Sequence, residues 1–435
     1  MGSLAVALVA VVPRTASAES ETPPPSASSA PTTSSAGHGT DPVDEGGVAL
    51  SLDDALKRAE EKAPEVVRAR YAVREALARR VGAGILMPVN PRLSGDVRPP
   101  VTGGTWKDFG YGANLEASLD LGGAPSARVR EADRGAEVAR TDVRLERQIA
   151  RAETWAAYVR AEAARARIEE TKSLVRIAER ILNASQKRST LGAAGDIEQA
   201  AATSELGVLR ASVDAALRQR EAHVATLRAL LDFGPEQKLS LTTPLRTPTD
   251  VPEAGPLVER ALRTRPEFDK LRARIAQLDA TDERLSRETF PRLGAYVGID
   301  AAPVSPIFGL VGLSVEIPVA QRNQGPRAVV KEARAGENAR IELQARQVLR
   351  EVTSTRKAFE HRAKELTTLT ETAIPAAERT LELVETGWLA GRFDIFRVTT
   401  ASRDLARIRE LRLDALEAVW LERIALERAV GGSLP

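Results

Sequence analysis

Two stretches of the chain alternate apolar and polar residues with a period of two. The apolar members are Tyr111, Ala113, Leu115, Ala117, Leu119 and Leu121 in the first stretch and Val311, Leu313, Val315 and Ile317 in the second. This period puts apolar side chains on one face of a β-strand and polar ones on the other. Weaker strand patterns at about 92–99 and 292–301 precede them, so the sequence predicts two β-hairpins.

Most of the remaining chain has apolar residues at the three-or-four spacing of α-helices. Helices are predicted at about 51–85, 125–186, 197–231, 256–287, 326–386 and 395–430. At 1.5 Å per residue, a helix of sixty residues is roughly 90 Å long and must pack along other long helices. Pro375 is expected to kink or break the second long helix.

The chain contains two similar halves, offset by about 200 residues. Pro64-Glu65 matches Pro266-Glu267, and Pro91-Arg92-Leu93 matches residues 291–293. Residues 126–140 match 327–340, and the glycine-containing turn at 191–195 matches 387–391. Four blocks in the same order indicate two repeats, which we place at residues 50–255 and 256–431. Each repeat consists of a helix, a hairpin and two long helices.

The first 49 residues differ from the rest. A short apolar run followed by Ala16-Ser17-Ala18 is typical of a secretory signal peptide, which we place at residues 1–18. Residues 19–49 are rich in Pro, Ser and Thr, so we expect a disordered linker there.

Charge and composition exclude several classes of protein. Lys and Arg number 62 against 60 Asp and Glu, so nucleic acid is not an expected partner. The chain has no cysteine, which excludes disulfides and thiolate metal sites. His38, His223 and His361 lack the spacing of metal ligands, and no phosphate-binding loop is present. We therefore expect no metal site, no cofactor and no enzymatic activity.

The hairpins allow two interpretations. Strands that are apolar on one face and polar on the other, with aromatic residues near their ends, suit a membrane barrel with a wet interior. The alternative is a small soluble sheet packed on helices. If the strands are transmembrane, four per chain leave open edges, so several copies must share one barrel. The sequence pattern does not choose between two, three or four copies.

The chain resembles the TolC family of outer-membrane efflux proteins. The resemblance is carried by the residues "SLDDALKRAEEKAPEV", "LDLGGAPSARVREADRGAEVAR" and "AIPAAERTLELVETGWLAGRFDI", and by their order. It covers about residues 50–431, and the opening block is most similar to the heavy-metal efflux subgroup. It implies a mainly α fold with a small β part, in which a homotrimer builds a twelve-stranded transmembrane β-barrel and a long α-barrel. It also implies a location in the outer membrane extending into the periplasm, a periplasmic adaptor, and an inner-membrane pump of the resistance-nodulation-division type.

The resemblance also assigns the two repeated turns to the periplasmic tips, where the channel closes. Gly192, Gly195, Gly387 and Gly391 are the turn glycines, and the gate candidates are Asp196, Glu198, Asp394, Arg397 and Thr400. Relatives often carry acidic residues at the positions of Arg397 and Thr400, so the expected ring of carboxylates is not plainly present. Arg397 and Glu198 are hypothesised to pair between neighbouring tips and hold the mouth shut. The alternative is that both are solvated surface charges.

The sequence thus favours an exit duct of a tripartite efflux system, which conducts its cargo passively and is powered by the pump. The alternative is a soluble periplasmic coiled-coil adaptor or scaffold.

Overall fold

The computed structural model describes residues 47–87, 89–100, 103–190, 196–248, 252–302 and 306–434. The expected signal peptide and the expected linker up to residue 46 lie outside the described residues. From Gly46 onward the chain forms one compact unit. Val48 and Ala49, at the end of the expected linker, already belong to a strand.

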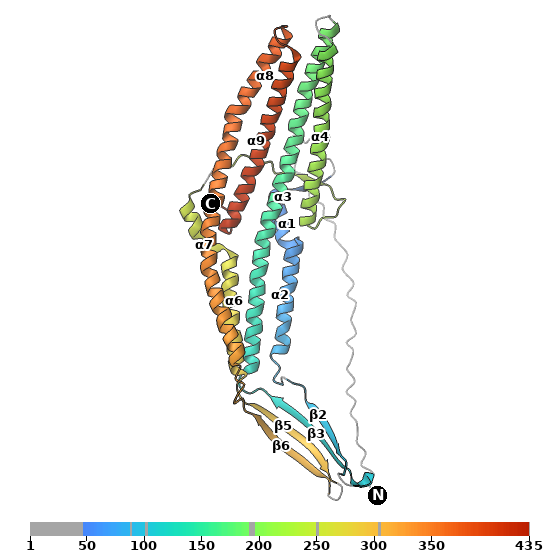
Figure 1. Cartoon of the computed structure of the whole chain (residues 1–435), viewed down its shortest axis with the longest axis vertical. Helices are drawn as coiled ribbons and strands as arrows, with labels where there is room; N and C mark the ends of the chain where they lie inside the picture. The colour runs from blue at the N-terminus through green and yellow to red at the C-terminus, as the bar shows by residue number, and fades with distance from the viewer. Residues whose placement is uncertain are drawn as a thin grey trace, which may run out of the picture. The chain divides into compact units, whose positions relative to one another are not determined.

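Each repeat contributes a pair of short helices, a pair of strands and long helices (Figure 1). The first repeat comprises β1 (Val48–Leu50), α1 (Leu52–Lys62), α2 (Pro64–Ala83), β2 (Arg92–Arg98), β3 (Gly110–Leu119), α3 (Ala124–Thr190), α4 (Asp196–Leu230) and β4 (Leu239–Leu241). The second comprises α5 (Ala254–Thr264), α6 (Pro266–Arg287), β5 (Arg292–Ala301), β6 (Phe308–Glu316), α7 (Gln324–Thr368), α8 (Ile374–Leu389) and α9 (Ile395–Val430).

The helices predicted at 51–85 and 256–287 are each broken in two, which corrects the prediction. Ala63 and Arg265 precede a proline and have extended backbones, with ψ of 134° and 125°. The proline ring disfavours the helical conformation of the residue before it, and proline itself suits the first turn of the next helix. The same break in both halves supports the duplication.

Pro375 does not end the second long helix. Residues Leu369–Ala373, just before it, form a π-helical turn that joins α7 to α8. Proline lacks an N–H and its ring crowds the carbonyl one turn earlier, so a wider turn accommodates it.

The two hairpins join into one antiparallel sheet with strand order β2-β3-β5-β6. The central pairing is between repeats, with Glu116 opposite Tyr296 and Leu115 opposite Val297. A second, parallel pairing of β1 with β4 was not predicted from the sequence. Tyr158 of α3 ties this pair to the helices, because its hydroxyl donates to the carbonyl of Leu50 and accepts from the N–H of Thr243.

Helix α3 is at the centre of the packing, in contact with α1, α2, α4, α6 and α9. Helix α7 packs on α5, α6 and α9, and α8 packs on α9 (Figure 1). The buried apolar residues form separate small clusters along the helices. Alanines such as Ala157, Ala161 and Ala164 are buried in α3, where small side chains let neighbouring helices approach closely. Among the described residues, no helix is both long enough and apolar enough to cross a membrane.

Candidate functional site

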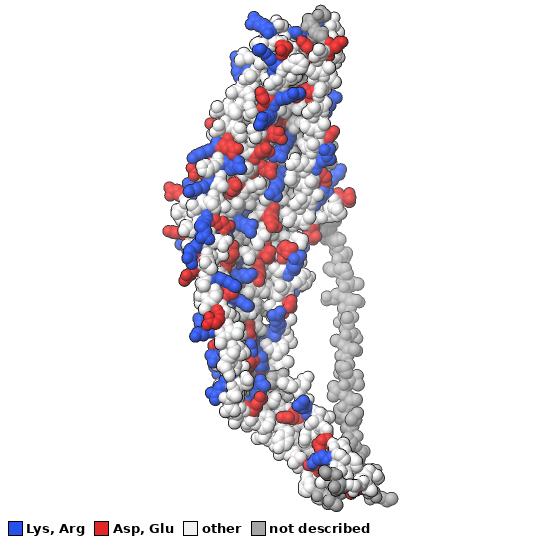
Figure 2. Space-filling view, in the orientation of Figure 1, with Lys and Arg blue, Asp and Glu red and all other residues white. Residues whose placement is uncertain are grey.

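The sheet exposes its apolar face. Paired strands place Leu93, Val97, Leu115, Val297, Val311, Leu313 and Val315 on this face. Leu93, Val311 and Leu313 are 76%, 86% and 73% exposed. In Figure 2, Lys, Arg, Asp and Glu are dense over the helices and sparse over the sheet. A contiguous exposed apolar surface of this kind marks contact with a membrane or a partner.

The opposite face of the sheet is polar. Arg98 pairs with Asp96 at 2.7 Å and with Asp300 of the central strand at 2.5 Å. Ser94, Asn114 and the other polar members of the alternating pattern lie on this face as well. The sheet therefore separates an apolar surface from a hydrated one.

Both edges of the sheet are open. Within the described residues, β2 pairs only with β3, and β6 pairs only with β5. Each edge presents unpaired N–H and C=O groups. In a lipid environment such groups need hydrogen-bond partners from another strand, because no water is there to supply them.

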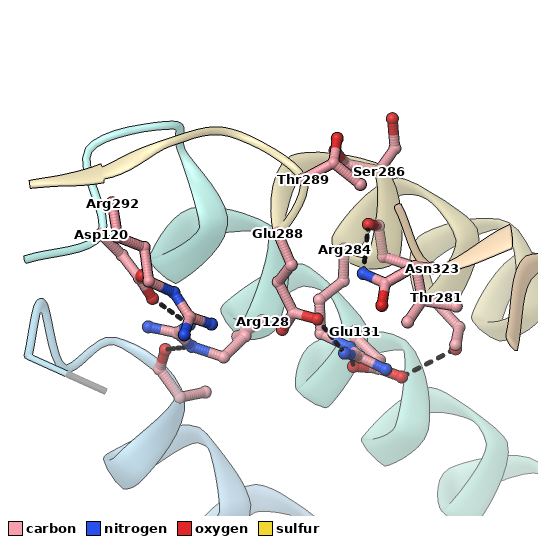
Figure 3. Close-up of polar contacts among 12 residues, drawn as sticks. Asp120, Arg128, Glu131, Thr281, Arg284, Ser286, Glu288, Thr289, Arg292 and Asn323 are labelled. Atoms are coloured by element: carbon pink, nitrogen blue, oxygen red, sulfur yellow. Dashed lines mark hydrogen bonds and ion pairs between the residues drawn. The ribbon is translucent and has the colours of Figure 1, made fainter. Parts of the chain in front are cut away.

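A buried carboxylate joins the sheet to the helices (Figure 3). Asp120, just after β3, has a side chain only 3% exposed and lies between two arginines. Arg128 in the first turns of α3 pairs with it at 2.7 Å, and Arg292 of β5 at 3.1 Å. Arg128 also donates to the carbonyls of Ala83 and Ile85 at the end of α2. One ionic cluster therefore fixes a helix end, two strands and a long helix relative to one another.

The turn between α8 and α9 depends on two glycines. Gly391 has a φ of +73°, a left-handed conformation that side chains disfavour. A Cβ on Gly387 would lie 2.4 Å from the ring of Phe393, so any larger residue there would have to displace this ring. The matching glycines of the first repeat, Gly192 and Gly195, lie outside the described residues.

The gate candidates of the second repeat make local contacts. Asp394 caps α9 by accepting a hydrogen bond from the N–H of Arg397 at 3.0 Å. The Arg397 guanidinium lies 5.0 Å from the centre of the Phe393 ring. The Thr400 hydroxyl donates to the carbonyl of Phe396. These residues thus shape the start of α9.

The first-repeat candidates lie at the start of α4. Asp196 and Glu198 are in its first turn, where carboxylates are favoured by the helix dipole. Glu198 lies 3.8 Å from Nε of Arg188, at the end of α3. The structure therefore places Glu198 beside Arg188 within the chain and does not bring it to Arg397.

Arg188 was not singled out from the sequence, although it connects the two hairpins. It donates to the carbonyl of Trp388 at 2.6 Å, and its guanidinium lies 5.3 Å from the centre of that residue's ring. Trp388 is fully buried in a cluster that includes Ile181 of α3 and Ile395 of α9. The available sequence signals were a lone Trp before the turn and a basic residue in the last turn of α3, where cations interact favourably with exposed carbonyls.

Further ion pairs connect the hairpins along their length. Arg409 of α9 contacts Glu170 of α3 at 2.7 Å and Glu378 of α8 at 2.6 Å. Arg403 of α9 contacts the buried Glu205 of α4 at 2.6 Å. The α8/α9 hairpin is therefore held to the α3/α4 hairpin by arginines from both sides.

The structure brings together no catalytic or metal-ligating set among the residues it describes. No group of three or more His, Asp or Glu side chains there is arranged to hold a metal ion. His223 is half-buried in α4, and burial lowers the pKa of its imidazole. His361 is exposed on α7.

Duplicated long helices carrying a four-stranded sheet define the fold of the TolC-family outer-membrane channels, and this chain has that fold. The expected fold class is thereby confirmed.

Among solved structures, CusC has a TM-score of 0.71 and 16% identical residues, over 89% of this chain and 93% of CusC. The outer-membrane channel OprN has a TM-score of 0.70 and 19% identity, over 88% of this chain and 90% of OprN. The cobalt-zinc-cadmium resistance protein CzcC of Cupriavidus metallidurans is a distant homologue, 24% identical over 330 residues that cover 73% of this chain and 76% of CzcC. No family model matches the chain.

Proposed function

We propose that the chain is the outer-membrane exit duct of an efflux system and conducts its cargo passively from the periplasm to the exterior. Three copies share a twelve-stranded barrel, and their long helices continue the conduit into the periplasm. Residues 1–18 direct export and the linker that follows ends before β1 begins at Val48, earlier than the expected residue 49. The two channel repeats meet near residue 255, where α5 has already begun at Ala254. The duct performs no catalysis and needs no cofactor.

The sheet is the observation that carries this proposal. Its apolar face is exposed, its other face is polar, and both its edges lack partners among the described residues. A soluble adaptor or scaffold would bury the apolar face against its own helices. In a barrel shared between copies, lipid covers the apolar face and strands of neighbouring copies pair with the edges.

The partners and cargo follow from the relatives. A duct of this fold works with a periplasmic adaptor and an inner-membrane pump, which we take to be of the resistance-nodulation-division type. CzcC is named a cobalt-zinc-cadmium resistance protein, which favours metal cations as cargo. The described residues hold no metal-binding cluster, as suits a conduit that must release its cargo.

We place the gate at the helix turns, with Asp196, Glu198, Asp394, Arg397 and Thr400 near the mouth and Gly192, Gly195, Gly387 and Gly391 in the turns. In the assembled trimer the exposed Arg397 faces a neighbouring tip, where Glu198 is the candidate counter-charge. Arg188 competes for that carboxylate from within the chain.

The test is to express the full chain in a Gram-negative host and locate it by fractionation. The duct requires detergent for extraction, migrates as an oligomer when unheated in SDS, and gives single-channel currents in planar bilayers. A monomer in the aqueous periplasmic fraction would overturn the proposal and leave the scaffold interpretation.

A further inference from the structure

Four segments connect the sheet to the helices, and we call them the boundary segments: residues 84–92, 120–128, 284–292 and 316–327 (Figure 1). Leu121 and Ile317 continue the apolar alternation of β3 and β6 beyond the ends of these strands. The apolar surface of the sheet therefore extends into the boundary segments. Their exposed apolar side chains are Ile85, Leu86, Met87, Val89, Leu121, Phe290, Ile317 and Val319.

The boundary segments are also basic. They contain seven arginines, no lysine and three carboxylates, although Lys and Arg nearly equal Asp and Glu in the whole chain. The hairpin ends at the opposite side of the sheet, residues 96–110 and 300–308, contain two cations and three carboxylates. Of the two ends of the sheet, only the one that meets the helices carries an excess of positive charge.

Most of these arginines are engaged by the chain itself. Those with a carboxylate partner are Arg128, Arg284, Arg292 and Arg327. Arg92 lies on the polar face of the sheet, because it is paired opposite Glu116. The other two, Arg287 and Arg322, are exposed, and neither contacts a carboxylate among the described residues.

A hydrogen bond holds the segment of Arg322 beside the end of α6. The side-chain amide of Asn323 donates to the carbonyl of Leu285 at 2.8 Å. Asn323 has a φ of +55°, a left-handed conformation that asparagine adopts more readily than most residues. Nε of Arg322 donates to the carbonyl of Pro318 at 3.2 Å. In the described part of the chain its two terminal nitrogens have no partner, so they are available to a ligand.

Arg287 lies in the last turn of α6, next to exposed apolar residues. A Cβ on Gly123 would be 3.9 Å from its Cδ, and a Cβ on Gly122 would overlap the side chain of Phe290. Arg287 and Phe290 therefore lie on adjacent glycines, one residue beyond the exposed Leu121. A cation beside exposed apolar side chains is typical of a segment at a membrane surface.

The length of the strands sets the depth of these arginines. Strand β5 has ten residues, which span roughly 33 Å at about 3.3 Å per residue. Tilted by about 40°, as in transmembrane barrels, it rises roughly 25 Å, which is the height of the apolar band of such barrels. Residues just beyond the strand on the helical side therefore lie at the level of the lipid headgroups.

We propose that Arg287 and Arg322 bind the phosphate groups of anionic phospholipids at the periplasmic surface of the outer membrane, with Phe290 and Val319 against the acyl chains. This rests on the proposed function, which places the sheet in the membrane. A guanidinium donates to two phosphate oxygens at once and keeps its charge at physiological pH. The opposite end of the sheet has an excess of carboxylates, so the binding is confined to the helical end.

Lipid binding to the native chain, purified in a neutral detergent, is the first measurement. Phosphatidylglycerol is expected to raise the unfolding temperature more than phosphatidylcholine, whose headgroup also carries a positive charge. Native mass spectrometry counts the bound lipids. Arg287→Gln with Arg322→Gln should lower the affinity for phosphatidylglycerol at least about tenfold, because losing one charge-assisted hydrogen bond has about this effect. Raising the salt from about 0.1 M to about 1 M should weaken native binding.

Arg346→Gln with Arg350→Gln is the matched control. Both residues are exposed arginines of α7 and lie roughly 30 Å or more from its first residue, at 1.5 Å per residue. The control removes the same charge outside the proposed site and should bind phosphatidylglycerol like the native chain. Arg287→Lys with Arg322→Lys keeps the charge and should bind with intermediate affinity, which tests the site if the glutamine variant does not assemble.

Equal stabilisation of the native oligomer by the two lipids, or equal loss of lipid in the site and control variants, would overturn the lipid site and leave the proposed duct intact. A response to inorganic phosphate without lipid would also overturn it, in favour of a site for free anions. A native chain that is monomeric in the aqueous fraction would overturn the duct as well.

Discussion

The guanidinium of Arg188, at the end of α3, donates to the carbonyl of Trp388 at 2.6 Å, at the end of α8. The same carbonyl accepts the N–H of Gly391 at 2.9 Å, so Arg188 adds a second, charged donor to it and acts as a cap supplied by another hairpin. The same side chain lies beside Glu198 of α4. One residue thus joins three helix ends where we place the gate.

Arg188→Ala is expected to loosen the mouth, because the α8/α9 hairpin loses its capping contact with α3. Single-channel recording should show a higher open probability or larger conductance. Arg188→Lys keeps the charge but not the planar donor geometry, so its open probability and conductance should lie between those of the native chain and Arg188→Ala. The exposed Arg180→Ala on the same helix is the control. Equal currents for the Arg188 and Arg180 variants would argue against the cap.

If Glu198 and Arg397 pair between neighbouring tips, alanine at both should raise conductance no more than either single change, because either change alone already breaks the pair. A double-mutant comparison of conductance measures the coupling directly. If the two single effects simply add, Glu198 acts through Arg188 alone and Arg397 only stacks on Phe393.

Gly387→Ala should destabilise the turn although its backbone conformation is ordinary, because the new methyl group meets the Phe393 ring. Gly387→Ala with Phe393→Leu should recover part of the loss, since the smaller side chain makes room. Gly391→Ala has no such rescue, because its cost comes from the left-handed backbone and is of order 1 kcal/mol. Thermal unfolding of the three variants in detergent separates the two causes.

Asp120→Ala should be among the most destabilising changes near the sheet. It leaves Arg128 and Arg292 facing each other without the carboxylate between them, and because both arginines are partly exposed we expect a loss of about 1–3 kcal/mol. Asp96→Ala, whose pair with Arg98 is half-exposed, should cost less than 1 kcal/mol. A smaller shift in unfolding temperature for Asp120→Ala than for Asp96→Ala would contradict the structural role of Asp120.

Two carboxylates should give opposite dependences of stability on pH. Burial raises the pKa of Glu427, against the opposing effect of Arg423, so its contribution is present below the ordinary glutamate pKa and lost as pH rises through the raised value. The hydrogen bond from Arg327 lowers the pKa of Asp282, so its contribution is present above the ordinary aspartate pKa and lost as pH falls through the lowered value.

The curve of unfolding temperature against pH should therefore be flatter than that of the native chain on the neutral side for Glu427→Gln. For Asp282→Asn it should be flatter on the acid side. Identical pH profiles for the two variants and the native chain would contradict both assignments.

Periodicity located the long helices because each packs one face along its length, and the strands because each is apolar on one face and polar on the other. It failed at Ala63 and Arg265, where the apolar spacing continues across a backbone break that the following proline imposes. It also missed β1 and β4, since three-residue strands carry too few residues to show a period.

The resemblance assigns the gate candidates to the helix turns, but the contacts of these residues depend on packing between distant helices. Arg188 and Trp388 are 200 positions apart, and nothing local in either segment signals the contact. The π-helical turn before Pro375 likewise reflects a compromise between a rigid ring and a helix that tertiary packing keeps continuous.

The ion pairs of Asp120 with Arg128 and Arg292 fix the first turns of α3 relative to the sheet. A helix of 67 residues rising 1.5 Å per residue is a lever about 100 Å long. A rotation of the helix by about one degree at its first turn moves its far end sideways by nearly 2 Å, by the same geometry. The ion pairs of Asp120 therefore set the angle at which α3 leaves the sheet, and with it the position of the helix end where we propose the gate.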